Sequence, residues 1–345
     1  MSRMREWINR FGLPRIIIVV FLLTLCVFAV MLRIPITDLT SDALVRTGMN
    51  GILVLAMVPG ILAGIGLNFG IPVGIVCGLI GGLVAIELDL YGFTAFFTAV
   101  LVSIPLSIGA GWLYGLLLNR VKGSEMTIAT YVGFSIVSLF SIGWLVMPFS
   151  SPEMRWPIGT GLRTTITLQG RYERILNHWG SFSIFGITIP TGLLLFMTAF
   201  CLFIWLFLRS KTGIAMKAVG DNPRFAVASG INVDRMRIIG TVLSTVLAAI
   251  GIVVYNQSFG FIQLYQAPMF MGFAAVAAVL IGGASVKKAN ISNVLIGTFL
   301  FQALLVVSLP VANKIMSLGS LAEITRIIVS NGIILYALTQ IGGGE

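Results

Sequence analysis

The chain has 345 residues, of which 57% are hydrophobic and only 10% are charged, and its formal net charge is +10. A soluble domain carries about 25% charged residues, so this composition excludes a soluble globular protein and indicates a polytopic membrane protein. The basic residues lie in short segments between apolar runs, as the positive-inside rule expects, and no compact basic domain remains that would bind nucleic acid.

Apolar runs long enough to cross about 30 Å of hydrocarbon recur from end to end. We predict an all-α fold: a single transmembrane domain over residues 1–345, with about ten spans and a cytoplasmic N-terminus. The expected spans are 15–33, 48–67, 71–86, 92–118, 126–148, 189–208, 237–258, 268–283, 291–311 and 322–340. No small-x-small cleavage site follows the first run, so it is interpreted as an uncleaved span.

Glycine and proline interrupt the apolar runs at Val58–Gly74 and at Met271–Ser285, in similar places of the two halves. Such breaks are typical of a solute path between two pseudo-repeats, because freed backbone groups need protein or a water-filled cavity around them. Close helix packing explains the same glycines, and interfacial anchoring explains polar residues near span ends. The predicted path residues are Asn68, Phe69, Pro72, Tyr255 and Gln257.

The polar stretch 149–188 is expected to be the largest extracytoplasmic loop. It contains Trp156, Trp179 and the only histidine, His178. The tryptophans are explained as interfacial anchors, and a docking surface for an external partner is the alternative.

Residue patterns of enzymes are absent from the sequence. It has no HExxH, no GxSxG, no Walker loop and no Cys/His cluster, so no catalytic residue, metal site or cofactor is expected. Cys26, Cys77 and Cys201 each lie in an apolar segment and form no disulfide framework. The predicted spans are almost free of ionisable residues, which weighs against a proton-coupled carrier, although carbonyls and hydroxyls can hold sodium.

The longest inner segment, 209–237, contains the sequence GDNPRFAVASGI. Asp221 and Asn222 are N-cap types, Pro223 suits the first helical position, and Gly230 suits the left-handed residue after the last turn. We therefore predict a helix of about two turns with Phe225 as a bulky apolar anchor. It either enters a groove on a partner or lies flat on the lipid of the inner leaflet.

The stretch KAVGDNPRFAVASGINVDRMRII resembles the cytoplasmic signature of permease subunits of ABC importers, in the branched-chain amino acid and simple-sugar class. In that family a pattern like AxGxNPxAAxxxGINV forms the coupling helix that docks into the ATPase subunit. The resemblance assigns this role to Gly220, Asn222, Pro223, Arg224, Phe225, Ala226, Ala228, Ser229 and Gly230. The span count and Gly282–Ser285 also resemble that family, over roughly residues 48–340.

The resemblance implies an importer subunit in the bacterial cell membrane that carries a small polar solute, a sugar before a nucleoside or a branched-chain amino acid. The implied partners are ATPase subunits, a second permease subunit, an external solute-binding protein and membrane lipid. The chain departs from sugar-type members at GIGLNFGIPVG and VKKANISN, which leaves the solute open. An ion-coupled carrier or channel working alone is the rival hypothesis.

Overall fold

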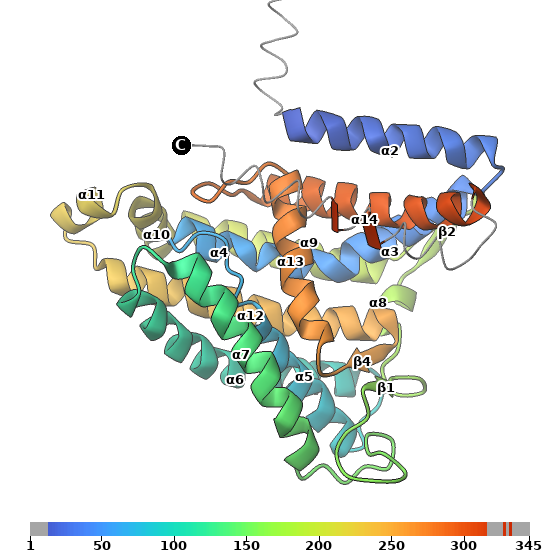
Figure 1. Cartoon of the computed structure of the whole chain (residues 1–345), viewed down its shortest axis with the longest axis horizontal. Helices are drawn as coiled ribbons and strands as arrows, with labels where there is room; N and C mark the ends of the chain where they lie inside the picture. The colour runs from blue at the N-terminus through green and yellow to red at the C-terminus, as the bar shows by residue number, and fades with distance from the viewer. Residues whose placement is uncertain (1–12, 316–326, 329–330, 333–345) are drawn as a thin grey trace, which may run out of the picture.

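The computed structural model describes residues 13–315, 327–328 and 331–332, and most of them are helical (Figure 1). The helices are α2 (Leu13–Met31), α3 (Ile36–Leu55), α4 (Met57–Leu62), α5 (Pro72–Glu87), α6 (Gly92–Arg120), α7 (Glu125–Val146), α8 (Ile175–His178), α9 (Thr191–Arg209), α10 (Lys211–Asp221), α11 (Pro223–Ala228), α12 (Val233–Phe259), α13 (Ala267–Ile281) and α14 (Ile291–Ile315). The strands are β1 (Thr165–Thr167), β2 (Phe182–Ile184), β3 (Ile187–Ile189) and β4 (Phe261–Gln263).

Each predicted span up to residue 311 falls on a helix. Among the described residues, 6 helices are long and apolar enough to cross a membrane, counting α3 and α4 as one, and α2, α5 and α13 are shorter apolar helices. The predicted span 322–340 lies almost entirely outside the described residues. The chain is therefore a mostly helical, multi-pass membrane protein.

The second span begins earlier than predicted. Helix α3 starts at Ile36 rather than near residue 48, and it carries Asp38, Asp42 and Arg46 on its added turns. These charges lowered the local hydropathy and hid the helix. Tertiary contacts stabilise these polar turns as helix. Helix α14 and strand β3 pack along α3, and the Thr188 backbone N–H donates to Ser41 Oγ at 2.9 Å.

Helix α5 lies at the centre of the bundle, in contact with α6, α7, α12 and α13. Its glycines allow backbone contact: a Cβ added to Gly74 or Gly78 would overlap carbonyl oxygens of α12, and one added to Gly81 would overlap a carbonyl oxygen of α6. Small residues are what membrane helices use for such close approach. Close packing therefore accounts for these α5 glycines.

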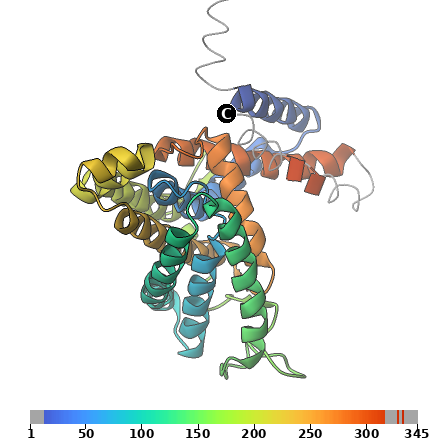
Figure 2. The ribbon, with the colours of Figure 1, turned by 60° about the vertical axis from the view of Figure 1, so that its left-hand side comes forward.

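The two ends of the bundle differ in structure. Helices α10 and α11 project at one end, seen at the left in Figure 1 and again in Figure 2, and the α6–α7 and α13–α14 turns lie at the same end. At the opposite end, the segment between α7 and α9 folds over the bundle. Strand β1 pairs antiparallel with β4, and β2 pairs with β3. These two short sheets are absent from the predicted all-α fold, because three-residue strands leave almost no periodic signal.

Arg171 fastens this folded segment to the α5–α6 turn. Its side chain is buried and bonds to Asp89 at 3.0 Å and to Glu153 at 2.6 Å, and it lies over the ring of Tyr91. Hydrogen bonds from Tyr91 and Arg171 lower the pKa of the Asp89 carboxyl, and the bond to Glu153 raises the pKa of Arg171. The segment between α7 and α9 is thus held by a charged clamp that the sequence patterns did not reveal.

Candidate functional site

Helix α11 has the caps that its sequence predicts. The Asn222 side chain accepts from the Phe225 backbone N–H at 3.1 Å, and Pro223 occupies the first turn. At the other end Gly230 has a φ of 77°, and the Ile231 N–H donates to Ala226 O at 2.9 Å. This is a Schellman ending, which only a residue tolerant of left-handed backbone completes without strain. The predicted short helix and both of its caps are confirmed.

The caps hold an apolar tip away from the bundle. Phe225 and Val227 are each 63% exposed, whereas Ala226 between them is buried against the protein. Arg224, Ala228, Ser229 and Gly230 are exposed beside them. A short, rigid helix with a protruding aromatic ring flanked by small residues has the form of an anchor for a pocket on another molecule.

The segment that carries α11 is braced against the bundle by charged groups at the start of α12. Arg237 bonds to Glu125 at 2.5 Å, with both side chains largely buried, and Lys122 bonds to Asp234 at 2.5 Å. The Asn119 side chain also donates to the Asp234 carbonyl at 2.9 Å. These contacts join the start of α12 to the α6–α7 turn. Because α12 directly follows α11, the C-terminal side of α11 is anchored to the bundle.

The break between α4 and α5 is closed by a buried polar cluster. Asn68 is 2% exposed, and its side chain donates to Ser244 Oγ at 2.8 Å. The Asn68 side-chain oxygen, Oδ1, accepts from the Gly70 N–H at 3.0 Å and from the Tyr114 hydroxyl at 2.8 Å. The cluster joins α6, α12 and the break, and it satisfies backbone that an interrupted membrane helix would leave exposed.

The neighbouring predicted path residues lie beside this cluster. The Phe69 ring lies 5.6 Å from the Phe273 ring of α13, centroid to centroid. Pro72 opens α5 and packs near Gly133 of α7. The structure thus brings Asn68, Phe69 and Pro72 together where α7, α12 and α13 approach the break.

Tyr255 and Gln257 lie towards the opposite end of α12, apart from the break. Tyr255 is half-buried and stacks on Phe259 with ring centroids 5.5 Å apart. Gln257 is fully buried, and its amide bonds to the Leu176 N–H and to the Asn177 side chain, both at 3.2 Å. Gln257 therefore positions the segment between α7 and α9, and its placement on a solute path stays a prediction.

Arg46 was missed as a candidate path residue because its helix begins before the predicted span 48–67, and Asn50 was not singled out within that span. Asp38, Asp42, Arg46 and Asn50 recur every fourth residue, so they share one face of α3. Arg46 is exposed and Asn50 half-buried, and α3 packs along α12, which carries Tyr255. A charged side chain on a membrane helix is costly in lipid, so this face needs water or another protein beside it.

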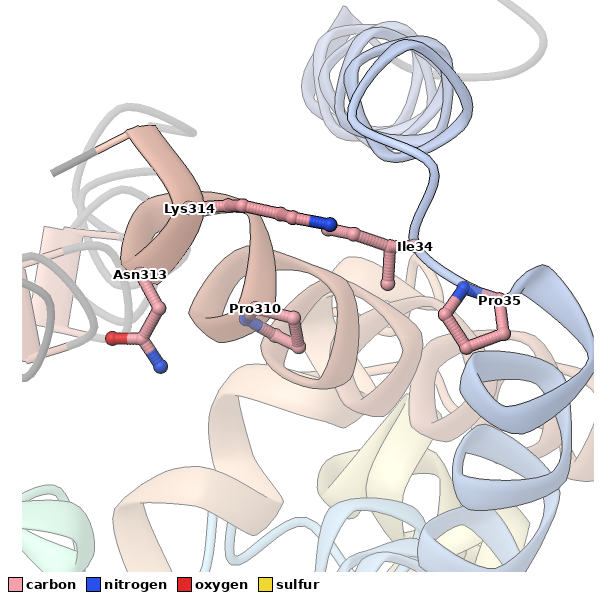
Figure 3. Close-up of a pocket in the computed structure, with 5 residues that line it drawn as sticks. All are labelled: Ile34, Pro35, Pro310, Asn313 and Lys314. Atoms are coloured by element: carbon pink, nitrogen blue, oxygen red, sulfur yellow. The ribbon is translucent and has the colours of Figure 1, made fainter. Parts of the chain in front are cut away.

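A surface hollow lies where the α2–α3 turn meets the end of α14 (Figure 3). It is lined by Ile34, Pro35, Pro310, Asn313 and Lys314. The Lys314 ammonium reaches across it and donates to the Leu32 carbonyl at 2.7 Å. None of the predicted path residues lines this hollow, and the described residues contain no cluster of His, Cys, Asp and Glu that could hold a metal ion.

A family model matches most of the chain. Residues 39–338 match the family described as "Branched-chain amino acid transport system / permease component". The nucleoside ABC transporter permease protein NupB of Lactococcus lactis subsp. cremoris is 25% identical over 54% of this chain and 52% of its own length. The galactofuranose transporter permease protein YtfT of Escherichia coli K12 is 25% identical over 61% of this chain and 58% of its own.

The autoinducer 2 import system permease protein LsrC of Escherichia coli O9:H4 is 28% identical over 55% of this chain and 58% of its own length. The chain thus spans about half the length of the curated relatives it matches. A solved metal-chelate type ABC transporter in an inward-facing conformation aligns over 94% of this chain at 15% identity, with a TM-score of 0.45. That TM-score is too low to show a shared fold. Because the family match covers most of the sequence, the chain belongs to the branched-chain amino acid transport system permease family, whose members are multi-pass subunits of the plasma membrane and not themselves enzymes.

Proposed function

We propose that this chain is the membrane-spanning permease subunit of an ATP-driven importer and forms half of the translocation path for a small polar solute. The observation that carries the proposal is α11, where two caps hold the exposed Phe225 and Val227 away from the bundle. An ATPase subunit with a complementary pocket would bind this tip. The chain then receives the energy of ATP hydrolysis from outside the membrane, in line with the scarcity of ionisable groups in the spans predicted from the sequence.

The proposed solute is a sugar, with nucleosides and branched-chain amino acids as alternatives. Two relatives are named for a nucleoside and for galactofuranose, and both of these solutes contain a furanose ring. The predicted path residues at the break are uncharged, which favours a polar, neutral solute over an ion. A ligand screen on the cognate external solute-binding protein would test this assignment, and a charged preferred ligand would contradict it.

The proposed topology has ten spans in two pseudo-repeat halves and a cytoplasmic N-terminus, with segment 209–237 inside and loop 149–188 outside. Lys122 lies at the same end of the bundle as α11, and so does the loop that carries Lys287 and Lys288. Positive charge on one side favours the cytoplasm there. Cysteines introduced at Lys287 and in loop 149–188 are expected to label from opposite sides, and labelling from one side would contradict this topology.

The docking role of α11 is tested by Phe225→Ala. Loss of this anchor is expected to cost about 2 kcal/mol at the interface, the usual threshold for a hot spot. The variant should insert normally but lose the co-purifying ATPase subunit and ATP-driven uptake. Phe185→Ala is the matched control, because Phe185 is 95% exposed at the opposite end of the bundle, in the turn between β2 and β3.

Normal ATP-driven uptake in Phe225→Ala would contradict the docking role. If α11 instead rests on lipid, Phe225→Ala should leave uptake near wild type, whereas charge reversal at Arg224 and Lys217 should weaken membrane contact. Uptake that survives ATP depletion and collapses with the ion gradient would support the rival ion-coupled carrier.

A further inference from the structure

Glycines from three elements pack around the end of α4 beside α11, where Gly64 contacts Gly220 and Gly240 contacts Ala63. Gly64 follows α4, Gly220 lies in the last turn of α10, and Gly240 lies in the second turn of α12. Direct contacts join α4 to α10, α4 to α12 and α10 to α12. The end of α4 is therefore held between the two elements that flank α11.

No side chain separates the backbone at the end of α4 from that of α10. A Cβ on Gly220 would overlap the Leu62 carbonyl oxygen, and a Cβ on Gly64 would lie 3.2 Å from the Gly220 Cα. On the other side, a Cβ on Gly240 would overlap the Ala63 Cβ and lie 2.9 Å from the Pro59 carbonyl oxygen. Backbones in such contact cannot approach further, so a displacement of α10 towards α4 must be passed on rather than absorbed by side-chain rotation.

The same short stretch leads directly to the polar cluster at the break. The Ile65 N–H donates to Gly60 O and the Gly64 N–H donates to Ile61 O, both at 3.1 Å, so the chain is tied back onto α4 after Ala63. Asn68 follows within a few residues and bonds to Ser244 and Tyr114. A movement that reaches Gly64 is thus applied to the residues that close the break.

We infer that Gly64, Gly220 and Gly240 are positioning residues that transmit movement of α11 to the α4–α5 break, and so couple the ATPase cycle to opening of the solute path. The inference rests on the proposed function. It assigns transmission to a backbone contact at one point, separate from the exposed tip of α11 that docks the partner. A substitution at Gly240 should therefore impair transmission of movement without releasing the ATPase subunit, whereas Phe225→Ala should release it.

The test compares Gly240→Ala and Gly220→Ala in the full complex reconstituted with its ATPase subunit and binding protein. Gly240 lies outside the docking segment 209–237, so Gly240→Ala should retain the ATPase subunit and basal hydrolysis. Solute uptake per ATP hydrolysed should fall by about tenfold, within the range typical of coupling between sites. Gly109→Ala on α6 is the matched control, since a Cβ there meets nothing within 4 Å.

A second substitution separates transmission from simple misfolding. Ala63→Gly removes the Cβ that would overlap the one in Gly240→Ala, so the double variant should recover much of the lost coupling. Uptake per ATP within about twofold of wild type in both single variants would overturn the inference. Loss of the ATPase subunit in Gly240→Ala, as expected for Phe225→Ala, would also overturn it, because the contact would then serve docking. A wild-type complex without ATP-dependent uptake would instead refute the proposed function, and this inference with it.

Discussion

Replacing Asn68 by leucine should destabilise the bundle by an amount that can be estimated from its contacts. Leucine has a similar size but cannot donate or accept a hydrogen bond. The substitution removes the bonds to Ser244 Oγ, the Gly70 N–H and the Tyr114 hydroxyl, all within 3.0 Å. It leaves those three partners buried without Asn68.

The expected cost follows from the number of bonds lost. A side-chain hydrogen bond contributes about 0.6 kcal/mol on average in a membrane protein and about 1 kcal/mol in soluble proteins. Three bonds therefore give about 2–3 kcal/mol for Asn68→Leu. Tyr114→Phe deletes only the bond to Asn68 and should cost about 0.6–1 kcal/mol.

The free energy of unfolding is measured by denaturant titration in mixed micelles, with thermal unfolding as a second probe. Tyr131→Phe is the control, because Tyr131 is exposed on α7. A double variant of Asn68 and Tyr114 should be less destabilised than the sum of its parts, since both changes remove the same bond. If Tyr114→Phe and Tyr131→Phe have equal stability and the double variant is additive, the polar cluster does not stabilise the break.

Two further predictions concern the ends of the bundle. Arg237→Met should cost up to about 3 kcal/mol of unfolding free energy, because it leaves the largely buried Glu125 without its ion-pair partner. Adding Glu125→Leu should recover most of this loss, and a double variant no more stable than the single one would contradict the prediction. Asp89 has a lowered folded pKa, so its pairing with Arg171 stabilises the folded loop above the unfolded pKa of about 4 and is lost as the pH falls through the folded value. Limited proteolysis of loop 149–188 should therefore stay constant from about pH 8 to 5 and increase below about pH 4, with a smaller change in Asp89→Asn; an increase between pH 8 and 5 would argue against the clamp.

Local signals in the sequence determined several features by themselves. The caps of α11 are Asn222 and Gly230, and each acts within a few residues of the backbone groups it satisfies. The apolar runs likewise determined the helices, because about 20 apolar residues have few stable alternatives in lipid. The family followed from the same capped segment, and the match over residues 39–338 confirmed it.

Tertiary contacts decided what these local signals could not. The first turns of α3 are polar and became helical through packing against α14 and β3. Gln257 had the pattern of a path residue, but it bonds to Leu176 and Asn177 of a segment far away in the sequence. From the sequence, Gly64 belonged only to the glycine-rich interruption Val58–Gly74, and Gly220 only to the coupling segment. Their contact depends on where α4 and α10 meet, and hydrophobic periodicity, which reports the burial of single helices, contains no information about which backbones touch.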